Sequence, residues 1–355
     1  MSIRTRSFVR TGFFVRAQLL VTALLAACLL GPISSIAQVQ ASDEKLGEAA
    51  FEKIVQATRS VVHVRTKALE NARTKSTLGE EREGTGVVIA PGGLIVTIGY
   101  LILEADSVEV IDHAGKTVPA SVVAYDHGTG FGLVRANAAI DARPLALGKS
   151  TNLEVMQRVL VASGATQEDV SMAYVTAQRP FSGYWEYSID KAIFTSPPRT
   201  DHSGAALISR DGELVGIGSL VVADAGIPGV RLPGNMFVPV DLLKPILDEL
   251  TRTGRTKAGI KPWIGVNSTE EDGRVKIIRV TEDSPAEAAG IKVGDLILAV
   301  GKEKVTSLAD FYRYIWAQGA PGVTVPLTVL QGVEVKQIKV KSMDRLEFLR
   351  KRPAT

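Results

Sequence analysis

The sequence predicts a mainly β protein, in which a β-barrel or β-sandwich region is followed by a smaller domain of mixed strands and helix. Short apolar segments recur between residues 60 and 162, separated by turn signals such as Pro91-Gly92-Gly93. Many short strands at regular intervals are typical of all-β barrels and sandwiches. A polar, basic stretch over residues 254–261 then precedes a second module with an alternating strand and helix pattern. That change of composition predicts a domain boundary.

Length and composition fit a folded protein of two or three domains. The chain has 355 residues, of which 45% are hydrophobic and 22% charged, so neither wholesale disorder nor a collagen-like repeat is expected. The formal net charge of +3 is too small to indicate nucleic-acid binding. The single Cys excludes an intramolecular disulfide, and the four His lack metal-ligand spacing, so we expect no metal. No cofactor is expected, because Gly84-Thr85-Gly86 is too short for a dinucleotide loop.

Residues 1–37 have the features of a secretory signal peptide. The segment contains four Arg and no acidic residue, an apolar run from Ala17 to Leu30, and small residues up to Ala37. This order predicts export, with cleavage after Ala37. Two alternatives stay open: a lipoprotein box ending at Cys28, which would be lipidated, and an uncleaved membrane anchor. All three place the rest of the chain outside the cytoplasm, as in a bacterial periplasm, with membrane contact only through the N-terminus.

The exported part begins with a predicted helix from Asp43 to about Val61, where apolar residues recur at helical spacing. Residues 66–83 are polar and of mixed charge, and we expect a mobile surface loop there. The β region closes with an amphipathic helix, predicted to begin at Asp241 as N-cap and to end at Gly254. The predicted strands of the β region are Ser60–Val64, Gly86–Ile89, Leu94–Thr97, Ser107–Ile111, Ala120–Tyr125, Gly132–Arg135 and Val159–Ala162.

The second module contains one predicted helix, Leu308–Ala317, for which Ser307 is the expected N-cap. Its predicted strands are Val275–Val280, Leu296–Val300, Thr324–Leu330 and Val335–Val340.

Two groups of motifs resemble the HtrA (Deg) family of trypsin-like serine proteases. The segments 84–97, 122–126, 147–150 and 211–217 resemble its protease domain, and the segments 263–266, 284–286 and 289–295 resemble its PDZ domain. The resemblance covers about residues 55–345. It implies a trypsin-like double six-stranded β-barrel over 44–253, a linker over 254–261, one PDZ domain (α+β) over 262–345 and a tail over 346–355.

The resemblance also locates the catalytic positions. A serine protease needs a Ser nucleophile, a His base and an Asp that orients the His. Ser203 stands at the nucleophile position, but Tyr100 stands at the His position and Gly130 at the Asp position. Asp201 replaces a Gly that helps to form the family's oxyanion hole. Because a phenol is a poor proton acceptor at neutral pH, this pattern predicts an inactive protease.

A substitute base is the alternative. His127 lies in the loop before Gly130 and is the best placed of the remaining histidines. His202 is adjacent to Ser203, and neighbouring side chains in an extended turn point apart, so we do not expect it to act as the base.

The PDZ-like module retains the features that peptide binding requires. Trp263-Ile264-Gly265-Val266 resembles the loop whose backbone N–H groups capture a peptide's C-terminal carboxylate, although Tyr or a small residue is usual at the position of Trp263. Gly265 permits close backbone approach. Phe311 and Ile315 share one helix face and either line the peptide groove or belong to the domain core.

Together these observations predict an exported, proteolytically inactive HtrA-like protein. It would bind peptide C-termini or unfolded chains as a chaperone, adaptor or regulator in envelope protein quality control, including regulation of an active protease relative. One alternative is an active serine endopeptidase that uses Ser203 with a non-standard base. A second is a structural envelope scaffold. Family analogy implies a homotrimer, for which the sequence itself supplies no contact.

Overall fold

The computed structural model describes residues 53, 55–164 and 169–350, and residues from Lys53 onward form one compact unit. The predicted signal segment 1–37, including Cys28, and the predicted helix from Asp43 to residue 52 lie outside the described residues. Residues 55–58, at the end of that predicted helix, are helical. Within the described part of the chain, no helix is long and apolar enough to cross a membrane.

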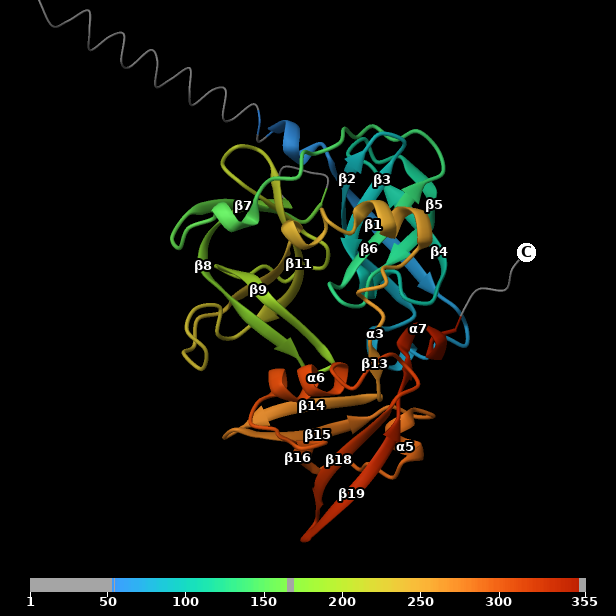
Figure 1. The fold of residues 1–355 in the computed structure, drawn as a ribbon. Helices are drawn as coiled ribbons and strands as arrows, with labels where there is room; N and C mark the ends of the chain where they lie inside the picture. The colour runs from blue at the N-terminus through green and yellow to red at the C-terminus, as the bar shows by residue number, and fades with distance from the viewer. Residues whose placement is uncertain (1–52, 54, 165–168, 351–355) are drawn as a thin grey trace, which may run out of the picture. The chain divides into compact units, whose positions relative to one another are not determined.

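The first β-barrel is closed by strands in the order β1-β2-β3-β6-β5-β4, with antiparallel neighbours (Figure 1). Its strands are rich in Val, Ile and Leu, whose side chains suit a pleated, buried surface. All of β3 is buried in the barrel. The bounds are β1 (Val61–Ala68), β2 (Glu81–Ala90), β3 (Leu94–Ile98), β4 (Ala105–Ile111), β5 (Thr117–Tyr125) and β6 (Phe131–Ala136).

The second barrel is closed in the order β10-β11-β12-β9-β8-β7. Strands β8 and β9 are longer than their neighbours, and their hairpin extends toward α6 and β14 (Figure 1). The bounds are β7 (Arg158–Ala162), β8 (Val170–Gly183), β9 (Tyr187–Ser196), β10 (Ala206–Ile208), β11 (Leu214–Val222) and β12 (Gly234–Pro239). The two closed barrels confirm the predicted mainly β, trypsin-like fold.

A mixed domain follows, with an antiparallel sheet in the order β14-β15-β16-β18-β19, so that β14 is an edge strand. The predicted N-cap of α6 is confirmed, because Ser307 Oγ accepts a hydrogen bond of 3.0 Å from the N–H of Asp310. A short pair, β13 with β20, precedes α7. The bounds are β13 (Pro262–Trp263), β14 (Val266–Glu271), β15 (Arg274–Val280), α5 (Pro285–Ala288), β16 (Leu296–Val300), β17 (Glu303–Lys304), α6 (Leu308–Trp316), β18 (Thr324–Gln331), β19 (Glu334–Lys341), β20 (Met343–Asp344) and α7 (Arg345–Phe348).

The predicted surface loop over 66–83 is wrong. Strand β1 runs to Ala68, α3 spans Lys75–Leu78, and β2 begins at Glu81. Arg82 is buried, and its guanidinium donates to the carbonyl oxygens of Leu103 at 2.6 Å and Tyr100 at 3.1 Å. The charged stretch 66–83 therefore contains the ends of two barrel strands, and one of its charged residues, Arg82, makes hydrogen bonds in the protein interior.

The single helix predicted from Asp241 is also wrong at its start. A 3-10 turn, η4 (Val240–Leu242), comes first, and α4 spans only Leu247–Thr253. Pro245 lies between them and disfavours helical geometry in the residue before it. Asp241 is therefore no helix N-cap; its carboxylate accepts from the N–H of Thr151. The predicted end at Gly254 is confirmed by a left-handed C-cap.

Candidate functional site

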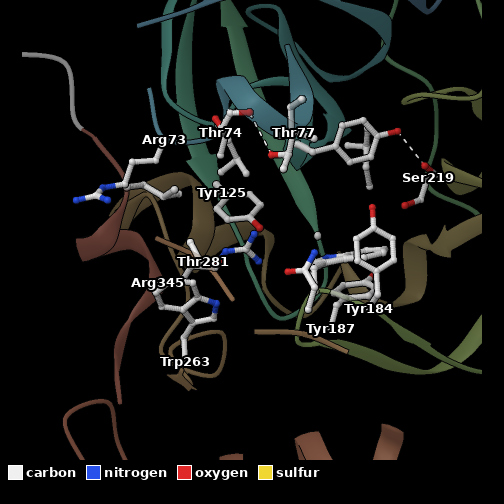
Figure 2. A pocket seen from close by; sticks show the side chains of 18 of the residues that line it. Arg73, Thr74, Thr77, Tyr125, Tyr184, Tyr187, Ser219, Trp263, Thr281 and Arg345 are labelled. Carbon is white, nitrogen blue, oxygen red and sulfur yellow. Dashed lines mark hydrogen bonds between the residues drawn. The ribbon is translucent and has the colours of Figure 1, made fainter. Parts of the chain in front are cut away.

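The three predicted triad positions line one cavity of about 410 Å³. Tyr100, Gly130 and Ser203 all contribute to its wall. Figure 2 shows Tyr187, from β9, and Trp263, from β13, among the side chains that line this cavity. The cleft therefore has a wall from the PDZ-like domain as well as walls from the barrels.

Tyr100 is the polar side-chain partner of Ser203 within the described part of the chain. The phenol oxygen lies 2.9 Å from Ser203 Oγ and 2.8 Å from the carbonyl oxygen of Ser219. The phenol hydroxyl is the donor in both contacts, so Ser203 Oγ accepts from Tyr100 and does not pass its own proton to the phenol. Burial raises the pKa of Tyr100 to about 12, and the hydrogen bond with Ser203 opposes this only in part. The phenol thus stays protonated at neutral pH.

Gly130 occupies a backbone conformation that disfavours the family's Asp. Its φ is +83°, in the left-handed region, and its N–H donates to the carbonyl of Asp126 at 2.8 Å. A Cβ at this position would lie 3.4 Å from the ring of Tyr187. The Tyr187 hydroxyl is held by the carbonyl of Thr129 at 2.7 Å. Tyr187 therefore borders the space that an orienting carboxylate would need.

Asp201 does not line the cavity, and its carboxylate is engaged elsewhere. It forms an ion pair of 2.5 Å with Arg199 and accepts a hydrogen bond of 2.5 Å from Ser163 Oγ. The Arg199 guanidinium is the main cause that lowers the pKa of Asp201. The negative charge expected beside an oxyanion is therefore paired with Arg199. The φ of Asp201 is not positive, so this residue does not adopt a glycine-type conformation.

The two histidines weighed as substitute bases have other surroundings. His127 is buried away from this cavity, and its Nδ1 lies 3.2 Å from both the Tyr125 hydroxyl and the Arg345 guanidinium. Burial first, and Arg345 second, lower the pKa of His127 well below its usual value. His202 lines the cavity, but its Nδ1 lies 2.9 Å from the carbonyl of Thr200. Among the described residues, no group of three His, Cys, Asp or Glu side chains could hold a metal ion.

The predicted peptide-binding residues lie together at the start of the PDZ-like domain and on α6. Gly265 has a φ of +91°, and an added Cβ would lie 2.3 Å from Ser284 Cβ. Trp263 is buried against Phe348, with ring centroids 4.7 Å apart. The other members belong to one fully or almost fully buried hydrophobic core, namely Ile264, Val266, Phe311 and Ile315.

Sequence reasoning missed Glu186, which lies in the β8–β9 turn. Its carboxylate accepts hydrogen bonds from the N–H groups of Ile264, Gly265 and Val266. A lone Glu between aromatic residues carries no local signal for such a contact, since the loop that it meets lies 78 to 80 residues later in the chain.

Comparisons with known proteins agree with this architecture. Residues 84–217 match the trypsin-like peptidase domain family, and residues 262–342 match the PDZ domain family. The serine endoprotease DegS of Escherichia coli K12 is 28% identical, over 93% of this chain and 95% of that protein. DegS of Haemophilus influenzae is 29% identical, over 82% of this chain and 86% of that protein.

Solved structures give the same result at the level of the fold. The HtrA-type protease AlgW with a decapeptide aligns with a TM-score of 0.52 and 18% identity, over 86% of this chain and 99% of that one. From its two matched domains, its relatives and its fold, the chain belongs to the HtrA family of trypsin-like proteins with a PDZ domain.

Proposed function

We propose that this chain is a non-proteolytic HtrA-family protein that binds peptide C-termini or unfolded chains outside the cytoplasm. One observation carries the first half of the proposal. The Ser203 hydroxyl faces the protonated phenol of Tyr100, 2.9 Å away, where a catalytic serine needs a base.

The acid–base chemistry of the phenol makes it a very weak substitute for imidazole. With a pKa of about 12 for Tyr100, about one phenol in 10⁵ is ionised at pH 7. A histidine of ordinary pKa is mostly in its basic form at the same pH. Gly130 supplies no carboxylate to orient a base, and its left-handed φ disfavours one. Ser203 is then a hydroxyl without activation.

The PDZ domain supports the binding half of the proposal. Its loop has the backbone N–H groups with which such domains hold a carboxylate, and Gly265 lets them approach it closely. An HtrA-type protease of similar fold has been solved with a decapeptide. A relative in Pseudomonas fulva is named a probable periplasmic serine endoprotease, which supports a periplasmic location here. Such a protein would act as a chaperone, an adaptor, or a regulator of an active protease relative.

An active serine endopeptidase is the second candidate. It is favoured by the position of Ser203 in the cleft and by the relatives, which are named serine proteases. The two candidates differ in whether any group removes the Ser203 proton.

Casein digestion tests the proposal. The exported part of the chain, purified and shown by circular dichroism to be folded, is incubated with casein beside the Ser203→Ala variant. We expect no cleavage above that variant. Cleavage that disappears in Ser203→Ala would establish the endopeptidase and overturn the proposal.

A further inference from the structure

The β8–β9 turn presents a carboxylate to the loop that opens the PDZ domain. Glu186 Oε1 accepts from the N–H groups of Gly265 at 2.7 Å and Val266 at 3.0 Å, and Oε2 accepts from Ile264 at 3.1 Å. The Glu186 residue is only 1% exposed. Successive N–H groups that converge on one point form an anion-binding concavity. In this structure that concavity is filled by a side chain of the same chain.

The backbone of the turn continues the contact along the edge of the PDZ sheet. The N–H of Ser268, in edge strand β14, donates to the carbonyl of Tyr184 at 2.8 Å. On α6, the Tyr312 hydroxyl donates to the carbonyl of Gly183 at 2.8 Å. A peptide that adds a strand to a sheet edge uses the same kind of main-chain hydrogen bond. The turn therefore meets the sheet edge and the helix that border the groove, as well as the carboxylate loop.

We infer that Glu186 is an internal ligand of the PDZ carboxylate loop, and that a free peptide C-terminus binds only after the β8–β9 turn has left. Both carboxylates would need the N–H groups of Ile264, Gly265 and Val266, so the two states exclude each other. The apparent affinity for a peptide is then reduced by the fraction of molecules in which the turn is undocked. The inference that a free peptide replaces Glu186 rests on the proposed peptide-binding function, whereas the contact of Glu186 with the loop does not.

The docked turn has features of a displaceable contact. Glu186 has a φ of +57°, a left-handed conformation that is uncommon for residues other than Gly and persists where surrounding contacts hold it. Within the described residues, no Lys or Arg lies within ion-pair distance of its carboxylate, which depends on the N–H donors and, more weakly, on the charge of Arg345. Ionised groups that are buried without a partner charge are costly to desolvate. A peptide carboxylate that arrives with its own strand contacts can therefore compete.

The test uses the exported chain with Glu186→Gln, which keeps the shape but replaces one acceptor oxygen by an NH2 group that faces a backbone N–H donor, and Glu303→Gln as a matched control. Glu303 is an exposed residue of β17 in the PDZ domain. The first measurement is hydrogen exchange at the amides of residues 264–266. We expect at least about tenfold faster exchange in Glu186→Gln than in the wild type and Glu303→Gln. Tyr312→Phe, which removes the hydroxyl that donates to Gly183, should shift exchange in the same direction by less.

The second measurement is fluorescence anisotropy with fluorescein-labelled short peptides that end in a free carboxylate. Glu186→Gln should bind them about tenfold more tightly than the wild type, and amidated peptides should bind neither protein. Unchanged amide exchange in both Glu186→Gln and Tyr312→Phe would overturn the internal ligand. Faster exchange in Glu186→Gln without peptide binding by any variant would support the internal ligand and contradict the proposed peptide-binding function instead.

Discussion

The double variant Tyr100→His, Gly130→Asp returns both missing side-chain types to the cleft, and we expect it to show little or no proteolysis. The reason lies at residue 130, whose φ is +83°. A residue with a Cβ costs about 1–2 kcal/mol in that conformation. Its Cβ would already be in van der Waals contact with the Tyr187 ring, at 3.4 Å, so the carboxylate beyond it must find room beside a ring that is fixed to Thr129.

The expected rate follows from the two remaining defects. A triad histidine without its properly placed Asp loses about 10⁴ in rate. The loss of one oxyanion donor costs about a further 10²–10³, and such losses do not simply add. We therefore expect casein cleavage at least about 10⁴-fold slower than that of a triad-complete HtrA relative assayed in parallel.

The controls are Tyr100→His alone, which should be equally inactive, and Ser203→Ala in the double-variant background. Circular dichroism should show a melting temperature lowered by a few degrees through Gly130→Asp, in line with a cost of about 1–2 kcal/mol. Cleavage by the double variant that depends on Ser203 and lies within about a hundredfold of the relative would refute the reasoning on Gly130 and Asp201.

Three further predictions concern stability and pH. Gly265→Ala should lower the free energy of unfolding in urea by about 1–3 kcal/mol, because its Cβ would lie 2.3 Å from a side-chain carbon. In the control Gly273→Ala the added Cβ has its nearest neighbour at 3.7 Å, so the loss of stability should be smaller. Equal losses in the two variants would contradict this. Arg82→Met should lower the free energy of unfolding by about 2–4 kcal/mol, because it leaves buried carbonyl groups without a hydrogen-bond donor. The control Arg65→Met, at an exposed position, should lower it by less than about 1 kcal/mol. A loss below about 1 kcal/mol for Arg82→Met would show that those hydrogen bonds contribute little to stability. Burial raises the pKa of Glu186 from about 4.5 to about 7 in the docked turn, opposed by the N–H donors and the charge of Arg345, so the docked state binds more protons and docking weakens as pH rises between these values. Peptide affinity should accordingly rise from pH 5 to pH 7.5 in the wild type and stay flat in Glu186→Gln; parallel profiles would remove the linkage.

Much of the fold was predictable because its information is local. Apolar segments with turn residues between them mark most barrel strands, and Ser307 and Gly254 mark helix ends through their own caps. Residues 66–83 misled because barrel strands that alternate inward and outward positions tolerate many charges, and because the inward Arg82 is satisfied by distant carbonyls. Pro245, visible in the sequence, should have divided the predicted helix from Asp241.

In the candidate site too, the residues that local motifs mark could be predicted and the contacts between side chains or domains could not. Ser203, Tyr100 and Gly130 were identified through motifs in their own segments, and the structure brings all three to one cavity. The ion-pair partner of Asp201 is Arg199, only two residues away. The pair was nevertheless not predicted, because it depends on side-chain geometry that the spacing in the sequence does not give. Glu186 was beyond reach, because its role depends on a contact with another domain.

Covalent labelling of Ser203 by a fluorophosphonate is the most direct test of the central claim, that the cleft holds a serine without a base. The reagent reacts with activated serine hydroxyls and reports the chemistry without a substrate. The folded chain without residues 1–37 should remain unlabelled at pH 7–8 under conditions in which a triad-complete HtrA relative is labelled fully, as read by intact-protein mass spectrometry. Stoichiometric labelling that maps to Ser203 and is absent from Ser203→Ala would contradict the account.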